Sequence, residues 1–300
     1  MIHTKNISLL LICFLLFSCR VLNKTTTNLN AVQWAHGSEN CKENKDAAIQ
    51  IVRYNANTFI LRQNKCTNYE APFMFLFLGK EKALLMDTGA TEDPDKFPLY
   101  ATVKKIIEQW EQTNNTTIEL IVAHTHNHGD HKAGDAQFKN KKNVVLLGLE
   151  VEDVTSYFKI TNWPLTNATI DLGNRELTII PIPGHQKASI AVYDNETNIL
   201  LTGDSFYPGR LYIKEWEAYA LSIQRLVDFT AQHKITYILG NHIEMSKTPK
   251  KDYPTGTTFQ PDEQPLPLTV KNLLLLNKAL KKIGTIPSKK VCDYFIIYPV

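Results

Sequence analysis

The chain has 300 residues, of which 33 are Lys or Arg and 30 are Asp or Glu, so its formal net charge is +3. Apolar residues make up 43% and charged residues 21%, a globular composition that excludes a disordered or collagen-like chain. The near balance of charge gives no electrostatic basis for binding nucleic acid, and no such partner is expected. The length predicts one large domain or two small ones.

The N-terminus has the pattern of a secretory signal. Residues 7–17 are apolar except for Ser8, a run too short for a bilayer span of about 20 residues, and Arg20 follows it. The run ends in Leu-Phe-Ser-Cys19, which resembles the lipobox of bacterial lipoproteins, although Phe17 fits that motif loosely. A cleaved signal without lipid and an uncleaved anchor helix remain as alternatives. All three interpretations place the protein outside the cytoplasm.

The N-terminal pattern predicts three segments. Residues 1–18 form a lipoprotein-type signal peptide, the polar residues 19–46 form a tether, and residues 47–300 form the globular domain. We expect an exported protein, periplasmic or at the cell surface, that is held at the membrane by a lipid on Cys19.

Three cysteines lie outside the signal. In an oxidising compartment Cys41 and Cys66 could form a disulfide and leave Cys292 alone, but three buried free thiols fit the spacing equally well. None belongs to a Cys-x-x-Cys pair, so we expect no cysteine-ligated structural zinc site.

Short apolar or alternating runs in the first half predict strands at residues 49–54, 58–62, 73–78, 83–86, 118–123 and 144–147. Helical spacing of apolar residues predicts a helix over 98–112, a short helix that ends by Phe138, and another over 150–158.

The second half repeats this theme without repeating the sequence. Strands are predicted at residues 168–172, 176–181, 189–193, 199–202, 236–239 and 294–298, and helices at 215–233 and 268–283, with a Pro-rich connector over 248–267. Two similar halves that mix strands and helices indicate helices packed on the faces of two sheets.

The segment that follows the predicted strand at 118–123 is the most informative. It contains His124, His126, His128, Asp130 and His131 within eight residues. Imidazoles and a carboxylate at the end of a strand are good ligands for a borderline divalent metal. The adjacent Asp130 and His131 diverge, which favours two metal ions over one. We expect His124 to be structural and to orient its neighbours.

This segment resembles the H-x-H-x-D-H motif of the metallo-β-lactamase superfamily. Four further matches lie in the family's order over about residues 49–245: Asp87 in Asp-Thr-Gly before this segment, and after it His185 in Pro-Gly-His, Asp204 in Thr-Gly-Asp, and His242 in Gly-Asn-His. In the family the early aspartate supports the site and is usually not a ligand.

The resemblance implies an α/β fold, a four-layer αββα sandwich with the site at one edge between the sheets. It also implies that one zinc ion is held by His126, His128 and His185, that a second is held by Asp130, His131 and His242, and that Asp204 bridges them. A hydroxide on the metals would attack a carbonyl, with Asp130 as a proton relay. Iron or manganese in place of the two Zn²⁺ ions stays open.

The residue at the bridging position narrows the range of expected substrate classes. The best-known zinc β-lactamases have Cys there or lack a ligand, whereas Asp204 resembles the glyoxalase II, lactonase and phosphodiesterase branches. We expect a hydrolase of a small-molecule ester, thioester or lactone. The alternatives are β-lactamase or phosphodiesterase activity at the same site, an iron-dependent redox enzyme, and a non-catalytic binding protein on the same fold.

Residues near the motifs are candidates for substrate contact. Tyr207 is similar in placement to a tyrosine that contacts substrate in the lactonase branch, and we name it as a catalytic candidate that donates to the oxyanion. Arg210 is a candidate for docking an anion, although a solvated surface role is the commoner one. Residues 244–253 are expected to fold over the site mouth. Trp163 is a candidate for the rim, with core packing as the alternative.

Overall fold

The computed structural model describes residues 26–300. The predicted signal peptide, residues 1–18, and the predicted lipid-bearing Cys19 lie outside this range. Within it, the strands and helices expected from apolar periodicity are present, most with ends within one or two residues of the prediction.

The first sheet has six strands in the order β1-β2-β3-β4-β5-β6. β4, β5 and β6 pair in parallel and the other neighbours are antiparallel. All six residues of β3 are buried, as expected for an aromatic and aliphatic strand with both faces covered. The strands are β1 (Ile49–Asn55), β2 (Thr58–Gln63), β3 (Phe73–Leu78), β4 (Lys82–Met86), β5 (Glu119–Ala123) and β6 (Val144–Leu146).

The second sheet has five strands in the order β12-β10-β9-β8-β7. β10 and β12 pair in parallel, so their C-terminal ends meet at the same edge. The strands are β7 (Ala168–Asp171), β8 (Glu176–Pro181), β9 (Ile190–Asp194), β10 (Ile199–Gly203) and β12 (Tyr237–Gly240).

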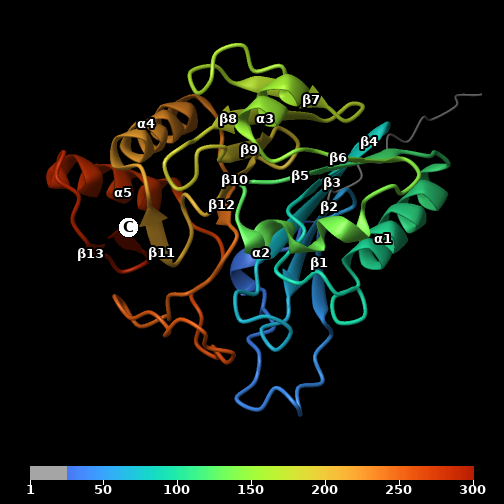
Figure 1. Cartoon of the computed structure of the whole chain (residues 1–300), viewed down its shortest axis with the longest axis horizontal. Coiled ribbons are helices and arrows are strands. Elements are labelled where there is room, and N and C mark those ends of the chain that lie inside the picture. The colour runs from blue at the N-terminus through green and yellow to red at the C-terminus, as the bar shows by residue number, and fades with distance from the viewer. Residues whose placement is uncertain (1–25) are drawn as a thin grey trace, which may run out of the picture.

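The two sheets pack face to face, and helices cover their outer faces. One apolar cluster joins the inner faces and includes Phe75 of the first sheet and Val192 of the second. α1 (Leu99–Asn114) packs on the outer face of the first sheet, and α4 (Trp216–Gln232) and α5 (Val270–Ile283) pack on that of the second. Figure 1 shows these helices at opposite sides of the molecule. The expected αββα sandwich is confirmed.

A small third sheet was not expected in full. It consists of β11 (Arg210–Ile213), β14 (Ile296–Pro299) and β13 (Lys290–Val291), with β14 in the middle. The sequence predicts β14 but no strand at the residues of β11. The segment begins with the charged Arg210 and has only a short apolar run, and it is a strand because β14, more than 80 residues later, pairs with it in parallel.

The described part of the expected tether, residues 26–46, packs on the domain. Leu29, in the short helix η1 (Leu29–Ala31), and Trp34 are buried in the cluster between the sheets. Cys41 is joined to Cys66 by a disulfide. These residues therefore act as part of the folded unit, which the polar composition of the segment conceals.

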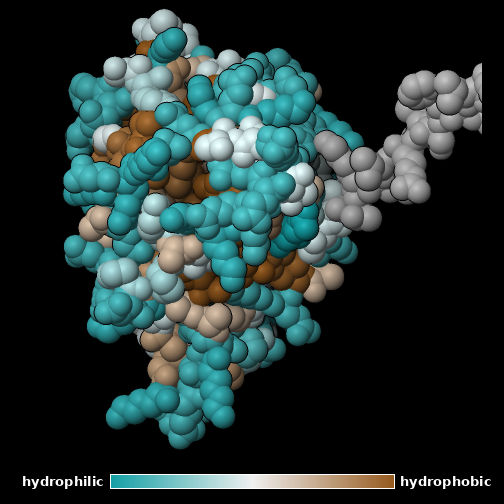
Figure 2. Space-filling model, turned by 90° about the vertical axis from the view of Figure 1, so that its right-hand side faces the viewer, coloured by the Kyte–Doolittle hydropathy of each residue, from teal (hydrophilic) through white to brown (hydrophobic). Residues whose placement is uncertain are grey.

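No helix among the described residues is long and apolar enough to cross a membrane. Figure 2 shows one face that is mainly hydrophilic, with hydrophobic residues in several separate patches.

Candidate metal centre

Two imidazoles leave the end of a buried strand together. β5 lies between β4 and β6, and the chain turns sharply where it leaves the sheet edge after Ala123. His126 follows in a bend, and His128, which has an extended backbone, precedes the first turn of α2 (Gly129–Lys132). Asp130 and His131 are the second and third residues of α2, and their ligand atoms lie 3.4 Å apart in one group, so the expected divergence of these two neighbours is wrong.

Three imidazoles form the first group. His126 Nε2 lies 3.0 Å from His128 Nδ1, and His185 Nε2 lies 3.2 Å and 3.1 Å from these two atoms. His185 comes from the turn between β8 and β9. Imidazole nitrogens that bind a tetrahedral zinc ion at about 2.0–2.1 Å are separated by roughly 3.3 Å, so this spacing fits one metal ion.

The second group combines two imidazoles with a carboxylate. His242 Nε2 lies 3.3 Å from His131 Nε2, and Asp130 Oδ2 lies 3.2 Å and 3.4 Å from these nitrogens. His242 follows β12, which brings it to the sheet edge where β10 also ends. Ligand atoms of each group lie within 4.8 Å of one another.

Asp204 belongs with the second group and lies on the side of it that faces the first group. Its Oδ2 atom is 3.4 Å from His131 Nε2 and 3.5 Å from His242 Nε2, and 4.0 Å and 3.9 Å from the Nε2 atoms of His126 and His185. Its other oxygen, Oδ1, is buried and has no hydrogen-bond partner. A buried carboxylate with a free oxygen and four facing imidazoles fits cations better than it fits an all-protein network.

Four of the five ligand imidazoles are held by an oxygen acceptor at their remaining ring nitrogen. Four imidazoles have such a partner on Nδ1: Thr125 Oγ1 at 3.1 Å for His126, Asp87 Oδ2 at 3.3 Å for His131, Tyr212 O at 2.7 Å for His185, and Glu70 O at 3.0 Å for His242. Because an oxygen acceptor keeps the proton on Nδ1, the lone pair of Nε2 points into the site. This is the usual arrangement of metal-binding histidine.

Asp87 organises this support from a strained position. It follows β4 with a φ of 70°, and its carboxylate accepts hydrogen bonds from the amide and hydroxyl of Thr125 and from Asn241 Nδ2. The Asp87 carboxylate thus contacts three parts of the site: Thr125, which precedes His126; Asn241, which precedes His242; and His131 itself. Its place beside the site and outside the groups agrees with the supporting role that the Asp-Thr-Gly motif implies.

Burial keeps the first group neutral. It lowers the pKa of His126, His128 and His185, and the neighbouring imidazoles lower the pKa of His126 and His128 further. Neutral imidazole is the form that binds a metal ion.

The second group is more polar. Burial opposes charge on His131 and His242, but Asp204 and Asp130 outweigh it and raise both pKa values, that of His242 to about 9. Burial opposes charge on Asp130 and Asp204 as well, but the facing imidazoles of His131 and His242 outweigh it. They hold the pKa of both carboxyl groups well below the usual range. A divalent cation would take the place of these protons among the same ligands.

The comparison with known proteins follows the same residues. Residues 70–242 match the family model described as the metallo-beta-lactamase superfamily, which is more than half of the chain. The chain belongs to this superfamily. The match begins at Glu70 and ends at His242, so it spans every residue of both groups.

Among known members, acyl-coenzyme A thioesterase MBLAC2 of Homo sapiens is 24% identical over an alignment of 204 residues, and the match covers 56% of this chain and 72% of that protein. The Gallus gallus protein of the same name is 34% identical over 82 residues, only 29% of its length. Of the solved structures, metallo-beta-lactamase FIM-1 from Pseudomonas aeruginosa covers 81% of this chain and 99% of its own at 16% identity and a TM-score of 0.51. This likeness supports the metallo-beta-lactamase fold alone.

Other residues singled out from the sequence have structural partners. His124 Nε2 lies 2.8 Å from Asp135 Oδ1, away from both ligand groups. Trp163 is partly buried against the cluster between the sheets. Both observations agree with the structural alternatives stated above.

The Tyr207 hydroxyl is engaged elsewhere. Tyr207 is buried, its ring lies 5.7 Å from that of His242, and the single proton of its hydroxyl is shared between the Arg210 carbonyl and the Glu244 carboxylate. Arg210 is also paired, with Glu244 and Asp252. The structure thus gives Tyr207 a packing position beside a ligand of this metallo-beta-lactamase site, and its expected donation to an oxyanion is not part of the observed geometry.

The segment after His242 differs from expectation. Met245 pairs with Asp252 and Ser246 with Glu263, so residues 244–263 double back on themselves. Phe259 then pairs with Gly37 of residues 26–46, which we call the N-terminal segment. These pairings fix the segment beside the N-terminal residues, and the structure gives no contact that places it over the metal centre.

The sequence could not identify two of the supports. Glu70 and Tyr212 hold ligand imidazoles through main-chain carbonyls, which every residue possesses, so no side-chain pattern marks them. The Asn241 support does have a signal, since it directly precedes His242 in the matched motif.

Proposed function

We propose that this metal-dependent hydrolase cleaves a small-molecule thioester of the acyl-coenzyme A type. The observation that carries the proposal is Asp204 Oδ2, which faces both ligand groups at 3.4–4.0 Å. An aspartate between two metal positions fits the hydrolase branches that act on esters and thioesters. The proteins named acyl-coenzyme A thioesterase support the thioester within that range.

Two metal ions fit the donors. His126, His128 and His185 would hold one, the group of Asp130, His131 and His242 would hold the other, and Asp204 would contact both. Imidazole-rich sets with few carboxylates suit zinc, which we propose as the metal, with iron and manganese as the alternatives to test. Such ions lower the pKa of a water molecule and polarise a substrate carbonyl.

The protein supplies charge and a proton acceptor. Asp204 is buried and its lowered pKa keeps it ionised, so it balances positive charge throughout the reaction. The side chain of Asp130 is 24% exposed, the greatest exposure in its group, and reaches solvent. Its Oδ1 atom, the oxygen that does not face His131 and His242, would take the proton of the attacking water and return it to the leaving sulfur.

Asp130→Ala tests this role. The change should lower kcat at least a hundredfold, the usual contribution of a positioned acid or base, while the thermal unfolding midpoint changes little. Kinetics equal to those of the unchanged protein would contradict the assignment.

The substrate experiment compares one acyl chain on different leaving groups. Protein loaded with two equivalents of zinc is tested on an acyl-coenzyme A thioester, the matching oxygen ester, a lactone, a penicillin and an aryl phosphodiester. We expect the thioester to have the highest kcat/KM, and chelation to abolish turnover until zinc returns. Faster hydrolysis of the penicillin or the phosphodiester would overturn the proposed thioester substrate, and activity unaffected by chelation would overturn the metal mechanism.

We also propose export, with a lipid on Cys19 as the anchor. The Cys41–Cys66 disulfide supports an oxidising compartment, where such bonds persist. Cell fractionation and the mass of the mature N-terminus test both parts. A cytoplasmic protein with an intact Met1 would contradict them.

A further inference from the structure

His242 is supported from an irregular connection between two strands. The acceptor for His185 Nδ1 lies in β11, and Asp87, the acceptor for His131, directly follows β4. The acceptor for His242 is the carbonyl of Glu70, in residues 64–71, which connect β2 to β3 and which we call the support turn. The orientation of one ligand therefore depends on an irregular stretch of backbone.

The support turn has no strand ladder: turn-type backbone hydrogen bonds, such as Thr67 N–H to Asn64 O and Ala71 N–H to Asn68 O, hold it together with side chains. Asn68 Nδ2 donates to the carbonyl of Ala90 at 2.8 Å, and Asn68 Oδ1 accepts from the Glu70 amide at 3.0 Å. The buried Lys65 amine donates to the carbonyl of Tyr69. Ala71 has a φ of 44°, a left-handed conformation that L residues rarely adopt. Such a turn keeps its shape only while its surroundings fix it.

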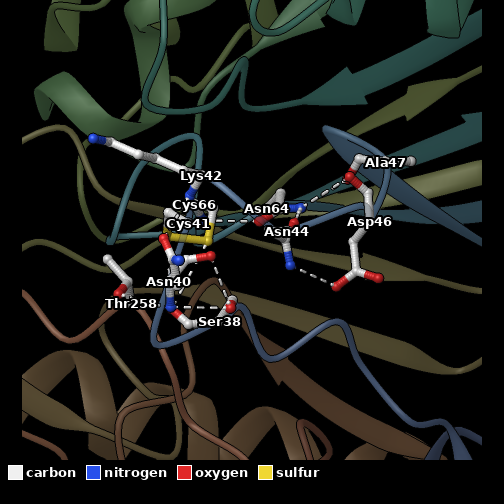
Figure 3. The surroundings of a disulfide bond; sticks show 10 residues. All are labelled: Ser38, Asn40, Cys41, Lys42, Asn44, Asp46, Ala47, Asn64, Cys66 and Thr258. Atoms are coloured by element: carbon white, nitrogen blue, oxygen red, sulfur yellow. Dashed lines mark hydrogen bonds between the residues drawn. A yellow bond between two sulfur atoms is a disulfide. The ribbon is translucent and has the colours of Figure 1, made fainter.

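The disulfide is the covalent part of those surroundings. Cys66 lies in the support turn, and its partner Cys41 lies in the N-terminal segment (Figure 3). Asn64, at the start of the turn, donates to the carbonyl of Ala47 and to the side chain of Asn44, so hydrogen bonds reinforce the same junction (Figure 3).

The N-terminal segment also contacts the chain that follows His242. The Ser38 amide donates to the carbonyl of Thr258 at 3.1 Å, and Gly37 pairs with Phe259. The disulfide thus links the support turn to residues that also contact Thr258 and Phe259, in the part of the chain that follows His242.

We propose that the Cys41–Cys66 disulfide is a positioning element for the second metal position, and that its cleavage weakens metal binding there selectively. The inference rests on the metal centre of the proposed function, but not on its substrate. The first group does not share the dependence, since the supports of His126 and His185 lie at the ends of the sheets. Outer supports of metal ligands typically change metal affinity 10–100-fold.

The test is a metal titration of Cys41→Ser/Cys66→Ser, with Cys292→Ser as the matched control. Metal-free protein is titrated with Zn²⁺ against a chromophoric chelator. We expect the double variant to bind one equivalent as tightly as the unchanged protein and the other 10–100-fold more weakly, and the control to bind both normally. Two normal equivalents, or equal weakening of both, would overturn the proposal.

A double-mutant cycle with His242→Ala identifies the affected position. In that background the serine substitutions should cause no further loss, because the ligand through which they act is gone. A further loss of the same size would show that the disulfide acts elsewhere and would refute the inference. If the double variant does not fold, Asn68→Ala, which releases the Glu70 amide, should weaken the same equivalent in the same direction, and a normal titration of that variant overturns the proposal.

The titration requires no substrate. Failure of the thioester assay with two intact zinc equivalents would refute the proposed function and leave this inference standing. Two normal zinc equivalents in the double variant would refute this inference and leave the proposed function standing.

Discussion

Replacing Asp204 by Asn removes one charge and keeps the shape of the side chain. Asp204 Oδ2 lies 3.4–4.0 Å from four imidazole nitrogens, two in each group, so both metal positions should lose affinity together. Two unit charges 4 Å apart interact by about 4 kcal/mol at an effective dielectric constant of about 20, and a divalent cation doubles this. Loss of even half of that attraction weakens binding by about a thousandfold.

The assay is the chelator titration, with Asp135→Asn as the control. Asp135 is also an acid near the site, but it contacts His124 and belongs to neither ligand group. We expect two normal equivalents in the control and two weakened ones in Asp204→Asn. If Asp204→Asn weakens only one equivalent, the carboxylate belongs to one position and does not bridge; if neither weakens, the geometric argument is wrong.

Three further predictions concern ligands, pH and stability. His126→Ala should lose a metal equivalent, whereas His124→Ala should retain both, and equal loss in the two variants would mean that the motif is misaligned. In protein stripped by a chelator, the raised pKa of His242 stabilises the fold fully below pH 6.5, and this contribution of about 3 kcal/mol should fade as the pH rises through about 9; a pH-independent unfolding midpoint between pH 6 and 10 would contradict it. The Cys41–Cys66 disulfide closes a loop of 25 residues, so its removal should lower the free energy of unfolding by about 3.5 kcal/mol in chemical denaturation, and a loss below about 1 kcal/mol would refute the loop-entropy reasoning.

The sequence determined the elements that have a strong local signal. The strands of both sheets are marked by apolar runs that remain apolar wherever the chain goes, as in β3, and α1 by its helical spacing. The residues brought together at the sheet edge were also named from the sequence, because ligand side chains are costly at strand ends unless they bind something, and few residue types can fill that role.

The tertiary structure decided what depends on partners far away in the chain. β11 exists because β14 lies beside it, and Leu29 is buried because the sheets leave room for it. The spacing of Cys41 and Cys66 left their pairing open until the fold brought their Cα atoms to 5.1 Å.

The same reason explains which parts of the site the sequence could not supply. The ligands are side chains, and their types are visible in the printed sequence, whereas the Glu70 carbonyl that orients His242 is a backbone atom common to all residues. Tyr207 shows the converse: its type suggests a donor, but its neighbours Arg210 and Glu244 take the hydroxyl. Residue type states what a group can bind, and only the packed chain determines which partner reaches it first.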